Sequence, residues 1–224
     1  MTLVTSVGSG FDYEHYRGEQ VLMNRAKFGR VSFSQAEVDA VADFFRARFR
    51  STQADDRPIA LCQGVRNGAE VRAFRRALRA RVIGTDISPT VWGVRDGFLC
   101  DFHSCPALWQ SQVAFMYSNS WDHSFDLDEL LRHWHSLLHD GGWLFLQHTP
   151  AHTADTRVTA GALHARLEAN GFKRIEWIEV PVTSPFVRRI VLALWHRIRR
   201  SIGLPPLPSL AVARGTRVVA ATRN

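Results

Sequence analysis

Short apolar runs alternate with stretches of helical spacing along most of this 224-residue chain. Each run suits one buried β-strand, and the stretches between them repeat apolar residues every three or four positions, as one face of an α-helix does. This alternation predicts an α/β fold with a mostly parallel sheet and helices on both of its faces. Strands are expected at residues 59–64, 82–86, 97–103, 143–148, 172–180 and 212–222, with another beginning at 113, and helices at about 69–81, 126–138 and 159–170.

The first expected strand ends in a glycine turn, and the second ends in a carboxylate. Gly64 closes the first apolar run, Gly68 follows four residues later, and Asp86 closes the second run. In a parallel sheet the ligand crevice lies at the carboxyl ends of the strands, where glycines let the backbone approach a ligand closely. A carboxylate at this crevice can accept hydrogen bonds from a ribose diol. The unit therefore predicts nucleoside binding, although the turn has neither a dinucleotide GxGxxG motif nor a phosphate-binding GK[ST] ending.

The third and fourth expected strands also end in polar motifs. Asp101 and Phe102 close the third run, and the fourth leads into Tyr-Ser-Asn-Ser-Trp-Asp-His-Ser-Phe-Asp at 117–126. With the glycine turn and the carboxylate after the second strand, these motifs cover about residues 57–150. They resemble those of class I S-adenosylmethionine-dependent methyltransferases of the small, type 11-like kind. The resemblance implies a Rossmann-like seven-stranded sheet whose last strand is antiparallel.

The resemblance also implies a cofactor, S-adenosyl-L-methionine, and residues to hold it. Asp86 would accept from the ribose, and Asp101 from the adenine amine, with Phe102 along the ring. The implied cofactor-binding residues are Gly64, Arg66, Asn67, Gly68, Asp86, Ile87, Asp101, Phe102, Ser118 and Asn119. The chain departs from the family pattern at Cys62, where the family has an acid, and at Arg66, where it has a glycine. A crossover with a degenerate site is the alternative.

Methyl transfer from a sulfonium mainly requires an acceptor held in line at roughly 3 to 3.5 Å, with a base for a hydroxyl or amine acceptor. His123 is the predicted base, because an unperturbed imidazole is largely neutral at physiological pH, and Asp122 is predicted to act with it. The alternative is that the two residues cap the following helix. Tyr16, Trp121 and His148 are expected to contact the substrate. No metal is expected, because the histidines at the strand ends form no ligand motif.

Two regions flank or interrupt this core. Residues 1–55 are expected to cover the core domain at 56–224, with an irregular arm at 11–20 and a helix opened by the capping box at 34–37. A basic amphipathic insert is expected at about 184–210. It could be a helix with a solvated face, a lid over the acceptor, a surface for RNA, or an interfacial contact with a membrane. We expect the lid.

The composition narrows the function classes. A hydrophobic content of 46% suits one domain, and no apolar run is long enough to span a bilayer. A signal peptide is not recognisable, so we expect a cytoplasmic protein with its three cysteines reduced. The net charge of the chain is +7; residues 173–224 carry ten Arg or Lys against two Glu, a net charge of +8, and residues 1–172 carry −1. We predict a methyltransferase acting on an oxygen or nitrogen of a small molecule; the alternatives are an RNA-directed enzyme and a non-catalytic cofactor-binding protein.

Overall fold

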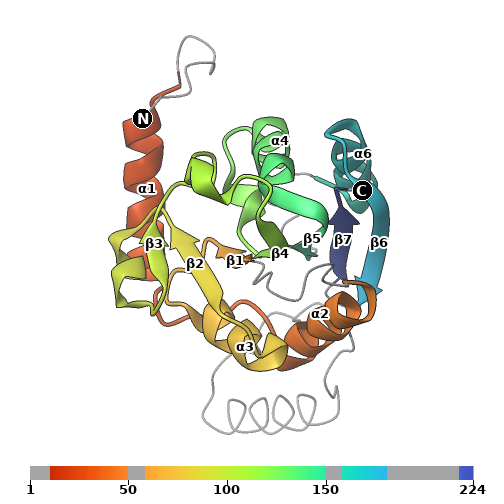
Figure 1. The fold of residues 1–224 in the computed structure, drawn as a ribbon. Coiled ribbons are helices and arrows are strands. Elements are labelled where there is room, and N and C mark those ends of the chain that lie inside the picture. The colour runs from red at the N-terminus through yellow and green to blue at the C-terminus, as the bar shows by residue number, and fades with distance from the viewer. Residues whose placement is uncertain (1–10, 50–58, 150–157, 181–216, 224) are drawn as a thin grey trace, which may run out of the picture.

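A computed structural model describes residues 11–49, 59–149, 158–180 and 217–223, and within them seven strands form one sheet (Figure 1). The strands are β1 (Ile59–Gln63), β2 (Val82–Asp86), β3 (Gly97–Leu99), β4 (Val113–Ser118), β5 (Leu138–His148), β6 (Lys173–Glu179) and β7 (Arg217–Thr222). Their order is β3-β2-β1-β4-β5-β7-β6. The strands β1 to β5 pair in parallel, and β7 is antiparallel to both of its neighbours. The predicted fold class, including its antiparallel last strand, is confirmed.

Helices cover both faces of the sheet, as predicted. One face packs against α2 (Gln35–Arg48) and α3 (Ala69–Leu78), through an apolar layer that includes Val41 and Phe74. The other packs against α4 (Leu127–Leu137) and α6 (Ala160–Ala169). Three short 3-10 helices, η1 (Pro89–Gly93), η2 (Ala107–Trp109) and η3 (Trp121–His123), follow strands β2, β3 and β4.

The starts of three helices were predictable from their capping residues. Ser34, Asp126 and Thr159 each accept a hydrogen bond from the backbone N–H three residues later, at 3.1, 2.9 and 3.1 Å. An N-cap side chain satisfies one of the four N–H groups that the first helical turn leaves unpaired. Local chemistry therefore fixes where α2, α4 and α6 begin.

A buried carboxylate ties α2 to the sheet. Glu37 accepts from the Tyr117 hydroxyl at 2.6 Å and from the Gln147 side-chain amide at 2.7 Å. Burial raises the pKa of Glu37, and these hydrogen bonds partly oppose the rise. The helix that follows the N-terminal segment is thereby fixed to β4 and β5.

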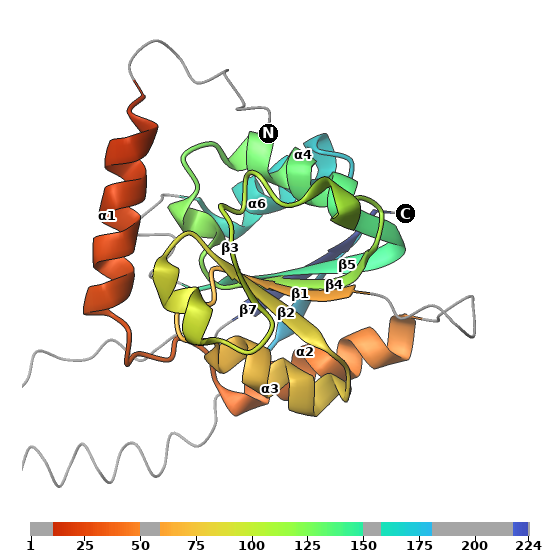
Figure 2. The ribbon, with the colours of Figure 1, turned by 60° about the vertical axis from the view of Figure 1, so that its left-hand side comes forward.

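The N-terminal segment differs from the prediction, because the expected irregular arm at 11–20 belongs to helix α1 (Tyr13–Ala26). Asp12 caps this helix by accepting from the His15 backbone N–H at 3.0 Å. None of its residues is buried. Figure 2 shows α1 at one end of the sheet, outside both helix layers.

Three other boundaries were wrong. The helix expected to reach residue 81 ends at Leu78, because Arg79 is left-handed with φ +52°. The strand expected at 97–103 ends at Leu99, since the chain turns where the Ser104 N–H bonds to the Asp101 carbonyl at 2.9 Å. Strand β5 begins five residues before the expected start, and a Cβ on Gly142 would lie 2.6 Å from the Val113 carbonyl oxygen. The absence of a side chain at Gly142 allows β5 to approach β4 closely.

Parts of two predictions lie outside the described residues. They are the basic insert at about 184–210 and residues 212–216 of the last strand. None of the helices in the described ranges is both long and apolar enough to span a bilayer.

Candidate cofactor and acceptor site

The glycine turn keeps a left-handed backbone at every second residue. Gly64, Arg66 and Gly68 have φ angles of +73°, +43° and +69°. A Cβ on Gly64 would lie 2.8 Å from the Ser120 Cβ, and one on Gly68 would lie 2.5 Å from a Val94 methyl carbon. Arg66 therefore holds the conformation of the glycine that it replaces, where a side chain is rarely tolerated. The turn keeps the backbone of a GxGxG loop without its middle glycine.

Asp86 lies at the carboxyl end of β2 and faces this turn. Its carboxylate accepts from the backbone N–H of Arg66 at 2.7 Å and of Ser88 at 2.8 Å. A third hydrogen bond comes from the Asn24 amide of α1, also at 2.7 Å. Burial raises the pKa of Asp86, and these hydrogen bonds oppose the rise. Ile87 follows it and is half-buried.

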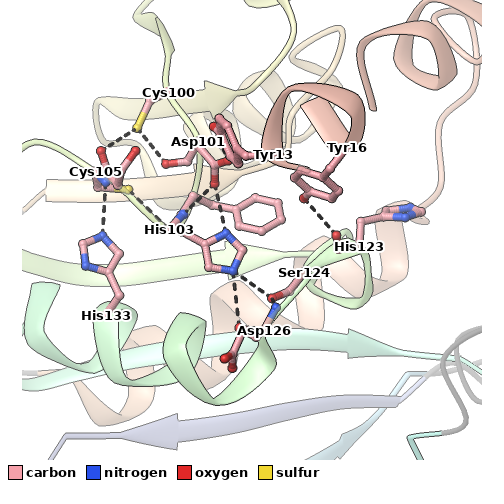
Figure 3. Close-up of polar contacts among 12 residues, drawn as sticks. Tyr13, Tyr16, Cys100, Asp101, His103, Cys105, His123, Ser124, Asp126 and His133 are labelled. Carbon is pink, nitrogen blue, oxygen red and sulfur yellow. Dashed lines mark hydrogen bonds and ion pairs between the residues drawn. The ribbon is translucent and has the colours of Figure 1, made fainter. Parts of the chain in front are cut away.

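Asp101 lies at the centre of a hydrogen-bonded chain (Figure 3). It accepts from the His103 backbone N–H at 2.8 Å and from the Tyr13 hydroxyl of α1 at 2.8 Å, and its Oδ1 lies 3.0 Å from His103 Nδ1. His103 Nε2 lies 2.9 Å from the Ser124 hydroxyl. Burial works against the charge of Asp101, but the hydrogen bonds from His103 and Tyr13 outweigh it and lower its pKa.

The side chain of Phe102 is buried rather than open to the crevice. Its ring packs at 5.1 Å from His103 and 5.9 Å from Trp134, and its carbonyl accepts from the indole N–H of Trp134. The expected contact with adenine therefore involves a residue that belongs to the apolar core.

Polar residues at the carboxyl end of β4 contact the two elements on either side of the glycine turn, β1 and α3. Ser118 donates to the Gln63 carbonyl at 3.3 Å, and the Asn119 amide donates to Glu70 on the first turn of α3 at 3.0 Å. Glu70 is buried, and its second carboxylate oxygen has no hydrogen-bond partner among the described residues. Cys62, which takes the position of the family acid, is fully buried, and burial raises the pKa of its thiol.

Helix α1 and the turn after it close over these residues. The Arg66 guanidinium donates to the Lys27 and Arg30 carbonyls at 3.3 and 3.5 Å, and the Asn67 amide donates to the Phe28 carbonyl at 2.6 Å. The Asn67 side chain also accepts from the backbone of α3. The side chain at the glycine position thus anchors the segment that covers the site.

The predicted catalytic and substrate residues gather around η3. His123 is partly exposed, its carbonyl accepts from the Tyr16 hydroxyl at 2.9 Å, and its ring points away from His103 in Figure 3. Trp121 and His148 have stacked rings 6.3 Å apart, and Asp122 lies between Trp121 and His123 in the 3-10 turn. The cap of α4 is Asp126, so the alternative capping role for Asp122 and His123 is wrong.

A cavity of about 320 Å³ opens beside this turn. Its lining includes Trp121, Asp122, Ser124, Phe125, Asp126 and Arg166. It reaches from the loop after β4 to α6, and Ser124 joins it to the chain that ends at Asp101. No three His, Cys, Asp or Glu side chains in the described ranges are grouped so as to hold a metal ion.

Sequence reasoning missed His103, Ser124, Glu70 and Asn24. Each is linked to a predicted residue by a contact between positions far apart in the chain, so no local pattern marks it. Of these, only His103 carried a signal, because it stands two residues after an expected strand-end carboxylate.

The sheet order, the left-handed turn after β1 and the carboxylates after β2 and β3 define the fold of class I S-adenosylmethionine-dependent methyltransferases. No protein-family model matches the chain, and no curated protein matches it in sequence. Solved structures show the fold at low sequence identity.

Three of these structures illustrate the range of activities among proteins with this fold. The phosphoethanolamine N-methyltransferase 2 of Haemonchus contortus, solved with S-adenosylhomocysteine, is 14% identical with a TM-score of 0.54; the match covers 91% of this chain but 59% of that one. The geranyl diphosphate C-methyltransferase of Streptomyces coelicolor A3(2), solved with Mg²⁺ and S-adenosyl-L-homocysteine, is 14% identical over 93% of this chain and 98% of that one, with a TM-score of 0.56. The [4+2]-cyclase SpnF is 20% identical over 87% and 83%, with a TM-score of 0.57.

Proposed function

We propose that this protein is an S-adenosylmethionine-dependent methyltransferase that acts on an oxygen or nitrogen of a small molecule. The observation that carries the proposal is the convergence of the left-handed turn at 64–68 with Asp86 and Asp101 at one edge of the sheet. Neighbours of this fold carry S-adenosylmethionine or its demethylated product. The residues present fit that group, since the left-handed glycine turn after β1, the Asp86 carboxylate and a buried, unpartnered oxygen of Glu70 lie at the carboxyl ends of neighbouring strands.

Asp86 would hold the ribose diol, and Asp101 would accept from the adenine amine. Both already carry hydrogen bonds from α1, through Asn24 and Tyr13. A carboxylate offers about four acceptor positions. Hydrogen bonds within the protein already use three of these positions on Asp86 and three on Asp101. Two ribose hydroxyls therefore need Asn24 to move away from Asp86.

The cavity beside η3 is the proposed acceptor pocket, because it adjoins the residues that follow β4. When bound, the cofactor supplies an activated methyl group, so the protein must mainly orient the acceptor and take its proton. His103 can take a proton through Ser124, which lines the cavity, while Asp101 holds the opposite ring nitrogen. His123 is the alternative base.

A binding experiment tests the proposal. In titration calorimetry, S-adenosylhomocysteine should bind the wild-type protein, and Asp86→Ala should lower its affinity at least about tenfold, because hydrogen bonds to a charged group contribute about 1.5 to 3 kcal/mol. Leu22→Ala, which changes an exposed side chain of α1, is the matched control and should bind normally. No binding by the wild-type protein, or normal binding by a folded Asp86→Ala, would refute the site.

A second function deserves the same test. Cys62 and Arg66 depart from the family turn, and one neighbour is a cyclase, so the chain could bind the cofactor without transferring its methyl group. Binding of S-adenosylmethionine without any methylation across a panel of hydroxyl and amine acceptors would favour this second function.

A further inference from the structure

Glu70 carries a buried carboxylate oxygen for which the described residues provide no hydrogen-bond partner. The residue is 8% exposed. Its Oε1 accepts from the Asn119 amide at 3.0 Å, whereas its buried Oε2 has no partner within the described ranges. Buried polar atoms are nearly always paired, and a buried charge is costly when it is not. A ligand is therefore a natural candidate for the partner of this oxygen.

The location of Glu70 limits what this ligand can be. It stands on the first turn of α3, two residues beyond Gly68, and Asn119 holds it at the carboxyl end of β4. The same end of β4 reaches the turn through Ser120, whose hydroxyl donates to the Gly64 carbonyl at 3.4 Å. The carboxylate therefore lies between the glycine turn and β4, while Asp86 and Asp101 follow β2 and β3 on the other side of β1. A nucleoside held by those two residues would extend its 5′ substituent towards Glu70.

Charge identifies the group at that end of the ligand. Cys62 replaces the family acid and is fully buried, and burial raises the pKa of its thiol, so it supplies no negative charge. Burial also raises the pKa of Glu70, while hydrogen bonds from its own backbone and from Asn119, and the charge of Arg66, act in the opposite direction. A cation placed against Oε2 would compensate for this burial.

We propose that Glu70 binds the α-ammonium group of the cofactor's methionine part and so replaces, from α3, the acid that is missing at Cys62. The inference rests on the proposed function. A purely structural role, in which the carboxylate only complements the positive end of the α3 dipole, predicts no effect on any ligand.

Two nucleosides separate these roles in titration calorimetry. S-adenosylhomocysteine has the amino-acid group, and 5′-methylthioadenosine lacks it but keeps the ribose and adenine. We expect Glu70→Gln to lower the affinity for S-adenosylhomocysteine about tenfold or more, and to change that for 5′-methylthioadenosine by less than about twofold. Asp86→Ala should weaken both ligands, and Glu168→Gln, at an exposed position on α6, should weaken neither.

Proton release provides a second measurement that needs only the wild-type protein. An ammonium group against Glu70 favours the charged carboxylate, so binding of S-adenosylhomocysteine should release protons as the pH is lowered towards the raised pKa of Glu70, seen as a dependence of the binding enthalpy on the ionisation enthalpy of the buffer. We expect no such release with 5′-methylthioadenosine or in Glu70→Gln.

The outcomes distinguish the two proposals. If the wild-type protein binds neither nucleoside, the proposed function fails and this inference fails with it. If both bind, but Glu70→Gln weakens them equally or not at all and proton release is the same for both, Glu70 does not bind the ammonium group and the cofactor site stands.

Discussion

The imidazole of His103 lies between the Asp101 carboxylate and the Ser124 hydroxyl, and these two partners fix the orientation of the ring. Nδ1 lies 3.0 Å from the Asp101 carboxylate, and Nε2 lies 2.9 Å from the Ser124 hydroxyl and 3.3 Å from the Asp126 carbonyl oxygen. Phe125 stacks on the ring at 3.9 Å and keeps it in place. The ring of His123, in contrast, points away from this chain in Figure 3. The position of its ring, beside Ser124 and the cavity, favours His103 over the predicted His123 as the base.

A pair of variants compares the two histidines. Loss of a general base typically lowers turnover by about 10² to 10⁴-fold. We expect His103→Gln to lower kcat within that range and to abolish the acidic limb of the pH–rate profile, whereas His123→Gln should lower kcat by less than about tenfold. S-adenosylhomocysteine affinity, measured in parallel, separates catalysis from cofactor binding. The reverse ranking would make His123 the base.

At the scale of single residues, the sequence alone was enough to identify helix-capping residues and the polar residues at strand ends. Ser34 and Asp126 were recognisable because an N-cap works within its own turn. Asp86 was recognisable because a strand and a turn precede it. Glu70 and Ser124 were not, since their roles come from Asn119 and His103, which other parts of the chain bring to them.

Among the elements, α1 connects the fold to the proposed chemistry. It has no buried residue, and it contacts the site through hydrogen bonds of Tyr13, Tyr16 and Asn24 and through the two tyrosine rings, which pack edge-on against Phe125. Elements with few buried apolar contacts open at low free energy. We therefore expect α1 to move when the cofactor enters.

Removing the contact between α1 and Asp86 tests this expectation. Asn24→Ala frees an acceptor position that a ribose hydroxyl needs, so S-adenosylhomocysteine should bind more tightly, by about fivefold for one hydrogen bond of about 1 kcal/mol. Leu22→Ala is again the control, because it alters α1 without touching the site. Weaker binding of Asn24→Ala would mean that α1 forms a wall of the bound site instead of competing for it.

Whether a stretch forms a helix or a strand was predictable wherever its apolar residues repeat with a clear period. The predicted boundaries of these elements were wrong where tertiary contacts determine them. Strand β3 is three residues long because the chain turns after Leu99, and β5 is long because Gly142 fits against β4. Helix α1 was not predicted as a helix. None of its residues is buried, and the contacts that hold it are made with distant residues of the site.

At the scale of the whole molecule, buried carboxyl groups contribute to the pH dependence of the free energy of unfolding. Burial raises the pKa values of Glu37, Glu70 and Asp86, so the folded protein binds more protons than the unfolded chain. Their contribution to stability is complete below their ordinary pKa values of about 4 and is lost as pH rises through the folded values. Asp101 has a lowered pKa, so its contribution is present above about 4 and lost on further acidification.

The expected contribution of these four carboxyls is a free energy of unfolding that increases as the pH falls through the three raised pKa values and decreases below about pH 4. Denaturant titration as a function of pH measures it. A double variant, Glu70→Gln with Asp86→Asn, should show a smaller increase as the pH falls towards about 4, because two of the three groups no longer titrate. An unchanged slope in the double variant would assign the pH dependence to other groups.

The position of β7 in the sheet has a consequence for the time course of synthesis. Strand β6 has β7 as its only neighbour in the described sheet, and residues 180–216 separate the two along the chain. A ribosome therefore completes β6 well before the strand that joins it to β5 exists. During this interval the outer edge of β5 is unpaired, and such edges are where chains associate wrongly. Pauses in translation before Arg217 should be the moments at which the nascent protein most needs a chaperone.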